Sequence, residues 1–261
     1  IELDGALQLL HGAVVAGDEF GGRAVACLAA AVADGNVRCH QATMARLGIA
    51  YDLLTHESDI LHLGFWQRAF EILRDAGAIR LEDEGKNSGC WVMSLESSPE
   101  FADMDDPDKI LVRSNGTVTY TGKDIAYQLW KLGLLLDEDG AKHDFGYRLF
   151  ATWEQPGPAE PVTYDSGSNI LARTTSNTGE SVPGGTYGGG QRVYNVIDVR
   201  QAYPQKVVKE AARVLGHPEA ADNSIHFSYE MVALTPGAVR EIERRTEVSF
   251  GLDDEAMRKT Y

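Results

Sequence analysis

Apolar residues recur at helical spacing through the first third of the chain. They predict helices over Leu3–Val15, Arg23–Ala33, Val37–Leu47 and Ile60–Ala76. Gly48 and Gly77 follow the last two runs, where glycine favours the left-handed residue that ends a helix. The acids around Glu57 and Asp59 precede the fourth helix and suit its dipole, and a place in the wall of a binding site is their second interpretation. Ile49–Leu54 is a candidate short strand.

Two hairpins are predicted in the middle of the chain. Ala78–Leu81 and Cys90–Leu95 alternate enough to be strands, and a polar turn joins them. Farther along, Asn115-Gly116 separates two runs of β-forming residues, and this pair favours a type I′ hairpin turn.

The second strand of the later hairpin leads into a helix. The strand is predicted to run through Tyr120 and Gly122, and the helix keeps its apolar residues at helical spacing at Ile125, Leu129, Leu132 and Leu136. Tyr120 and Asp124 therefore lie at a strand-to-helix junction. On local physics alone, an acid there most often pairs with the exposed N–H groups of the helix, and a strand tyrosine most often packs.

The last third of the chain reads as a β-α-β unit. A buried strand ending near Asp198, a helix over Pro204–Leu215 and a strand within Ile225–Leu234 predict a parallel pair with a right-handed crossover. Asp198, Arg200 and Gln201 should lie beyond the carboxyl end of the first strand, where open parallel sheets bind ligands.

A long segment before this unit is rich in turn-forming residues. Residues 152–190 combine Gly, Pro, Ser and Thr with little apolar periodicity, so we expect a flexible surface loop that proteases cut first. The run Gly188-Gly189-Gly190 lacks the lysine of a phosphate-binding loop and is weak evidence for one.

Composition limits the classes of function. The 261 residues are 43% hydrophobic, with no apolar run near the length of a membrane span and no signal peptide, so a soluble cytoplasmic protein is expected. A formal net charge of −15 argues against a broad surface that grips nucleic acid, and any such contact must be local. Cys27, Cys39 and Cys90 are not clustered, which favours neither disulfides nor a zinc site.

Five strings along the chain carry a further signal. The central string is VRSNGTVTYTGKDIAY, which is Val112–Tyr127. The others are DLLTHESDI (Asp52–Ile60), AIRLEDEGKNSGCWVM (Ala78–Met93), VYNVIDVRQAYPQ (Val193–Gln205) and IHFSYEMVAL (Ile225–Leu234). In this order the strings resemble parts of arginyl-tRNA synthetases, a class I family. The match covers roughly residues 40 to 240, and the order of the strings is more specific than any one motif.

The resemblance implies an α/β fold: part of a Rossmann-like class I catalytic domain, with a helical N-terminal part and inserted antiparallel hairpins. Residues 1–77 would be the helical part, 78–121 the hairpin insertion and 122–261 the second half of the catalytic domain. The implied reaction is ATP-dependent attachment of arginine to tRNA(Arg) through arginyl-adenylate, with Mg²⁺. Tyr120 and Asp124 resemble the residues that clamp the guanidinium group, and Gln201 resembles a polar residue that helps hold the amino acid.

Neither ATP-handling signature of class I synthetases is found. His62-Leu63-Gly64 imitates the start of the His-x-Gly-His signature, but Phe65 replaces the second histidine. The lysine-rich loop signature is also missing. We therefore expect a segment from the interior of a synthetase catalytic region that does not activate arginine by itself, with tRNA contacted mainly by other parts of the protein. The alternative is a stand-alone, catalytically inactive relative that binds an amino acid, a tRNA or a protein.

Overall fold

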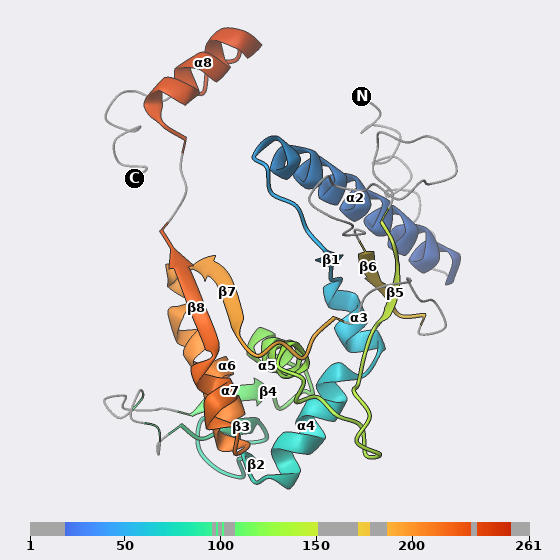
Figure 1. The fold of residues 1–261 in the computed structure, drawn as a ribbon, viewed down its shortest axis with the longest axis vertical. Coiled ribbons are helices and arrows are strands. Elements are labelled where there is room, and N and C mark those ends of the chain that lie inside the picture. The colour runs from blue at the N-terminus through green and yellow to red at the C-terminus, as the bar shows by residue number, and fades with distance from the viewer. Residues whose placement is uncertain are drawn as a thin grey trace. The chain divides into compact units, whose positions relative to one another are not determined.

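The structure is a computed structural model, and it describes residues 19–95, 98, 101, 108–150, 172–177, 187–230 and 234–251 (Figure 1). The chain divides into two compact units, and each is discontinuous in sequence. The first unit contains residues 1–56 and 145–185, and the second contains residues 57–144 and 186–261. The described part of the chain is a mixed α/β structure.

The first unit joins a long helix to a small mixed sheet. Its elements are α2 (Glu19–Arg46), β1 (Leu53–Leu54), β5 (Gly146–Leu149) and β6 (Ala172–Thr175). β6 is the central strand, parallel to β1 and antiparallel to β5. Asp34 of α2 accepts hydrogen bonds from Arg38 one turn later at 3.0 Å and from Arg173 of β6 at 3.1 Å. This shared carboxylate ties the helix to the sheet.

Two predictions in the first unit are corrected. The helices predicted over Arg23–Ala33 and Val37–Leu47 form one continuous helix, because Gly35 is accommodated within it and the ion pair between Asp34 and Arg38 spans the expected break. Ala172–Thr175 lies within the loop predicted over residues 152–190 but is a strand with buried Ala172 and Thr174. The predicted helix Leu3–Val15 and the rest of that loop before Tyr187, apart from residues 172–177, lie outside the described residues.

The second unit contains an antiparallel sheet packed against helices. Its first elements are α3 (Glu57–His62), α4 (Phe65–Asp75), β2 (Ile79–Leu81), β3 (Trp91–Met93), β4 (Lys109–Val112) and α5 (Tyr120–Lys131). The sheet order is β2-β3-β4, which confirms the hairpin predicted from Ala78 to Leu95 and adds a third strand. α4 packs against α5. The core they share is fully buried and includes Phe65, Leu73, Val92, Met93, Leu111, Ile125 and Leu129.

A glycine divides the helix predicted over Ile60–Ala76. Gly64 has φ 72°, a left-handed conformation that favours glycine and ends α3 before α4 begins at Phe65. His62 is therefore the last residue of a short helix. The predicted glycine caps are confirmed, since Gly48 and Gly77 both have φ 69°.

The hairpin around Asn115-Gly116 differs from its prediction. A type I′ turn needs positive φ at both central residues, but of this pair only Gly116 has it, at 81°. The Gly116 N–H donates to the Arg113 carbonyl at 2.8 Å, and the Arg113 N–H donates to the Thr117 carbonyl at 2.9 Å. The returning strand is reduced to a single bridge between Val112 and Val118, because the next helix begins almost at once.

The remaining elements confirm the β-α-β prediction. They are β7 (Val193–Asp198), the 3₁₀ turn η2 (Val199–Gln201), α6 (Ala202–Val214), α7 (Pro218–Asp222), β8 (Ser224–Tyr229) and α8 (Pro236–Thr246). β7 and β8 are parallel, and α6 packs along one face of the pair (Figure 1). The other face carries large side chains that are exposed to solvent: Tyr194, Val196, Phe227 and Tyr229.

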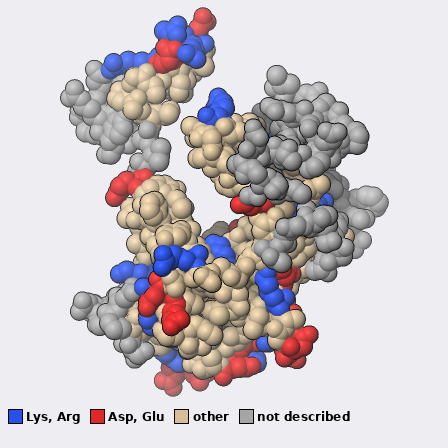
Figure 2. Space-filling view, viewed as in Figure 1, with Lys and Arg blue, Asp and Glu red and all other residues tan. Residues whose placement is uncertain are grey.

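Charge is unevenly spread over the second unit. In Figure 2, Asp and Glu side chains gather along the lower edge of the view, where α4 ends and β2 lies. Asp75 at the end of α4 and Asp83 and Glu84 after β2 are all exposed.

Among the described residues, no helix is long and apolar enough to cross a membrane.

Candidate functional site

The N-terminus of α5 organises the candidate site. The Thr119 side chain caps the helix by accepting a hydrogen bond from the Gly122 N–H at 3.3 Å, and its hydroxyl donates to the Ile110 carbonyl of β4 at 3.2 Å. Gly122 leaves room for Trp66, because a Cβ atom there would lie 3.0 Å from the Trp66 ring. The helix start is thus fixed both to the sheet and to α4.

Tyr120 is the first residue of α5 rather than part of a strand, which corrects the prediction. Its side chain is 77% exposed, and its ring lies 4.8 Å from the Lys123 ammonium group. The interpretation from local physics alone, that a strand tyrosine here would pack, is therefore wrong. It lies one helical turn before Asp124, so the two residues predicted to act together share one side of α5.

Asp124 has an unusual electrostatic environment. The surrounding protein displaces solvent and raises the pKa of this carboxyl above its ordinary value. Lys131 opposes the rise in pKa, Glu57 adds to it by like-charge repulsion, and Lys123 opposes it. The side chain nevertheless keeps access to solvent, so the shift is moderated by water. Glu57 also forms an ion pair with Lys123, which places the start of α3 beside this group.

A half-buried lysine lies two helical turns after Asp124. Desolvation lowers the pKa of Lys131, and the nearby Asp124 carboxylate counteracts the lowering. The Lys131 ammonium group donates to the Asn195 side-chain oxygen at 3.0 Å and lies 4.3 Å from the centre of the Tyr127 ring. It is held in place by an amide and an aromatic face.

A network of buried amides links α5 to β7 and α6. The Asn195 side-chain NH₂ group donates to Gln128 at 3.1 Å and to Gln205 at 2.9 Å, and Gln128 in turn donates to the Ser224 hydroxyl at 2.9 Å. These residues were not predicted from the sequence. The sequence signal that could have indicated them is spacing: Asp124, Gln128 and Lys131 lie at positions that share one face of a helix.

Gln201 lies beyond the carboxyl end of β7, as predicted. It is exposed, ends the 3₁₀ turn and begins α6 without capping it through its side chain. Beside it, the Arg200 guanidinium forms a bidentate ion pair with the Asp198 carboxylate, with N–O distances of 2.8 and 2.9 Å. This pair lowers the pKa of the Asp198 carboxyl. Among the described residues, no hydrogen bond joins Gln201 to Tyr120 or Asp124.

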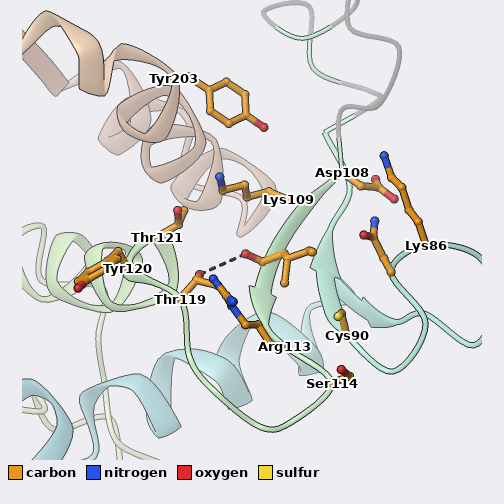
Figure 3. A pocket seen from close by; sticks show the side chains of 12 residues that line it. Lys86, Cys90, Asp108, Lys109, Arg113, Ser114, Thr119, Tyr120, Thr121 and Tyr203 are labelled. Atoms are coloured by element: carbon orange, nitrogen blue, oxygen red, sulfur yellow. Dashed lines mark hydrogen bonds between the residues drawn. The ribbon is translucent and has the colours of Figure 1, made fainter.

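A cavity of about 680 Å³ opens beside the start of α5 (Figure 3). Its lining comes from the turn after β2, from β4 and the turn that follows it, and from the first turns of α5 and α6. Lys86, Lys109 and Arg113 contribute positive charge, whereas Asp108 contributes a carboxylate. The part of the chain that the structure describes contains no group of three or more His, Cys, Asp or Glu side chains suited to hold a metal ion.

Comparison with known proteins shows similarity to arginine–tRNA ligases. The chain is 38% identical over 223 residues to the ligase of Pyrococcus abyssi, a match that covers 85% of this chain and 31% of the relative. It is 36% identical over 236 residues to the ligase of Thermococcus kodakarensis, which covers 90% of this chain and 33% of the relative. No family model matches the chain.

A solved structure agrees with these sequence matches. Thermus thermophilus arginyl-tRNA synthetase is similar with a TM-score of 0.58 and 30% identity, over 95% of this chain and 42% of that one. The chain spans about a third of the length of the curated relatives. Over the matched residues, the chain belongs to the arginine–tRNA ligase family.

Proposed function

We propose that the chain forms part of the catalytic region of an arginine–tRNA ligase, which attaches arginine to tRNA(Arg) through an arginyl-adenylate made from ATP. The observation that carries this proposal is sequence identity of 38% to such a ligase across 85% of the chain. The parallel pair β7 and β8 with α6 between them in sequence supports a Rossmann-like sheet as its framework.

Asp124 is proposed as the carboxylate that binds the guanidinium group of arginine. A guanidinium is a planar cation with a fork of N–H donors, which a carboxylate accepts with strong charge-assisted hydrogen bonds. The elevated pKa of Asp124 fits this role, because partial desolvation that disfavours a lone carboxylate also strengthens its pairing with a cation. Tyr120, one turn earlier, offers a hydroxyl acceptor and an exposed ring to the same ligand.

Gln201 is proposed to contact the polar backbone groups of the amino acid. Its support is its place beyond the carboxyl end of a parallel strand. ATP, with its Mg²⁺, and most of tRNA(Arg) are proposed to bind outside this chain, because the relatives are about three times as long. Catalysis would then consist mainly of positioning the arginine carboxylate for attack on the α-phosphate of ATP.

An arginine titration of the 261-residue chain tests the pocket. Removing one partner of a charge pair costs about 2–5 kcal/mol of binding, so Asp124→Asn should raise the dissociation constant for arginine by about 30-fold or more. Isothermal titration calorimetry measures this constant. Asp75→Asn is the matched control, because Asp75 is exposed and pairs only with its neighbour Arg74 among the described residues.

The result that would contradict the pocket is an arginine affinity that is equal in the unaltered chain and in Asp124→Asn. Absence of measurable arginine binding by the folded, unaltered chain would contradict it as well. Citrulline has the shape of arginine without its charge and should bind poorly to the unaltered chain. No specific observation favours the alternative of a stand-alone inactive protein.

A further inference from the structure

A second cavity, of about 300 Å³, lies where α6, the end of α7 and β8 meet (Figure 1). It shares no lining residue with the cavity beside the start of α5. On α6, Gln205, Lys206 and Lys209 line it, and their spacing puts them on one side of the helix. On β8, Ser224 and His226 are two residues apart, so both side chains lie on the same face of the strand. Polar side chains of two neighbouring elements therefore meet at this cavity.

The cavity is more positive than the chain as a whole. The net charge of the chain is −15, yet this cavity has two lysines and one acid, Asp222. The Asp222 carboxylate already accepts a hydrogen bond from Arg213 at 2.8 Å, and it lies 4.0 Å from the Lys209 ammonium group. Lys206 is exposed and forms no ion pair or hydrogen bond with any described residue. The charge that is left over is positive, and it favours an anionic ligand.

Gln205 supplies a buried hydrogen-bond donor to the cavity. The residue is only 8% exposed, and its side-chain oxygen accepts a hydrogen bond from Asn195 at 2.9 Å. Its side-chain NH₂ group forms no hydrogen bond within the described ranges of the chain. A buried donor that is left unpaired costs free energy, so a ligand oxygen that accepts from it would gain binding. This amide is the feature that distinguishes the cavity from a surface with lysines.

His226 supplies an acceptor. Its Nε2 atom lies 3.0 Å from the carbonyl oxygen of Ile197, and a carbonyl can only accept, so Nε2 carries the hydrogen in this contact. In the neutral ring, Nδ1 is then an acceptor, and it has no partner in the part of the chain that the structure describes. A ligand that fits the whole cavity therefore combines negatively charged oxygens with an O–H or N–H donor.

We propose that this cavity binds a small hydroxycarboxylic acid. Lys206, Lys209 and the Gln205 amide donate to the carboxylate oxygens. The His226 Nδ1 atom accepts a hydrogen bond from the hydroxyl group. This site goes beyond the attachment of arginine to tRNA, and none of its residues belongs to the proposed arginine pocket.

The surroundings favour a hydroxyl over an amino group as the donor of the ligand. The ammonium group of an amino acid would lie beside two lysines, and like charges repel each other. The size of the cavity is at the lower end of the range for small-molecule sites, which suits an acid of a few carbon atoms.

The test compares malate with succinate, because malate is succinate with one added hydroxyl group. NMR spectra of the isotope-labelled full chain are recorded during titration with each acid at constant ionic strength. Malate should shift the signals of the Gln205 side-chain NH₂ group and of the His226 ring until they saturate. It should bind about fivefold more tightly than succinate, which is the net effect of one hydrogen bond.

Two variants separate the parts of the site. Lys206→Gln/Lys209→Gln should weaken the binding of both acids by about tenfold, because two partly exposed ion pairs are lost. His226→Phe should remove the preference for malate and leave succinate binding nearly unchanged. If either variant unfolds, as judged by circular dichroism, the exposed single variant Lys206→Gln and the two acids with the unaltered chain still test the site.

The matched control is Arg74→Gln/Arg244→Gln, which removes the same charge from exposed helical positions outside the cavity. Absence of a saturable shift at Gln205 with the folded, unaltered chain overturns the site, and so does an equal loss in the control. Equal affinity for malate and succinate overturns the assignment of a hydroxyl-bearing ligand. Arginine affinity should be unchanged in Lys206→Gln/Lys209→Gln, so failure here is distinguishable from failure of the Asp124 pocket.

Discussion

At the scale of single residues, the candidate arginine site is shaped by charges of both signs. Asp124 has one carboxylate and two lysines near enough to influence its pKa, and the largest effect is the displacement of solvent. The pKa of this acid is higher in the folded chain than in the unfolded chain. In the pH range between the two pKa values, the folded chain therefore binds more protons than the unfolded chain. The contribution of Asp124 to the free energy of unfolding therefore rises as pH falls through the folded pKa. An acid in a favourable ion pair shows the opposite pH dependence.

Lys131 should control the pH range over which Asp124 can bind a guanidinium group. Its positive charge lowers the pKa of Asp124, so Lys131→Gln should raise that pKa further. Arginine affinity should then begin to fall at a higher pH on acidification than in the unaltered chain. The titration of the Asp124 carboxyl carbon by NMR measures the first effect directly, and exposed Lys206→Gln serves as the control. An unchanged or lower pKa would mean that Lys131 does not act on this carboxylate.

Asn195 should be the most sensitive position of the buried amide network. Asn195→Ala leaves the buried Gln128 and Gln205 side chains and the half-buried Lys131 each without one hydrogen-bond partner. Since one unsatisfied buried polar group costs about 1–3 kcal/mol, we expect a loss of about 2 kcal/mol or more in the free energy of unfolding. Urea denaturation measures this loss. Val196→Ala, at an exposed position of the same strand, should cost less than about 0.5 kcal/mol, and similar losses in both variants would argue against the network.

At the scale of elements, α5 illustrates what the sequence can and cannot predict. Its apolar spacing correctly predicted a helix that buries Ile125 and Leu129, although the helix ends at Lys131. The start was placed too late, because Thr119 was taken for a strand residue, whereas its side chain caps the helix while also bonding to β4. The environment of Asp124 was not predictable, since Lys131 is held by Asn195, which lies 64 residues away in sequence.

The glycine run after the long loop has a packing role at the end of α5. The Gly189 and Gly190 N–H groups donate to the carbonyls of Trp130 and Lys131 at 3.3 and 2.7 Å. Gly188 has φ 73°, and a Cβ atom there would lie 2.9 Å from the Trp130 ring. The run thus approaches the helix more closely than residues with side chains could, and its glycines need no phosphate to explain them.

This packing gives a matched pair of substitutions. Gly188→Ala and Gly189→Ala both place alanine at positive φ, which costs about 1–2 kcal/mol. Only Gly188→Ala also adds an atom against Trp130, so it should cost at least about 1 kcal/mol more. Chemical unfolding followed by tryptophan fluorescence compares the two. Equal losses would show that Trp130 moves aside without cost.

At the scale of the whole chain, local patterns predicted some units well and distant pairings poorly. The β7-α6-β8 unit was predictable because its strands and helix follow one another closely. The sheet of the first unit was not, because β1 pairs with β6 across more than a hundred residues and neither short strand has a strong pattern. The division into residues 1–77, 78–121 and 122–261 stays a prediction, as does the cytoplasmic location.

The open face of the parallel pair has a practical consequence for handling the protein. Tyr194, Val196, Phe227 and Tyr229 form an apolar surface, and parallel sheets are normally covered on both sides. An exposed apolar surface of this kind favours association between molecules, and such association weakens on dilution. Binding measurements are therefore best made on dilute samples, in which the apolar surface stays exposed to solvent.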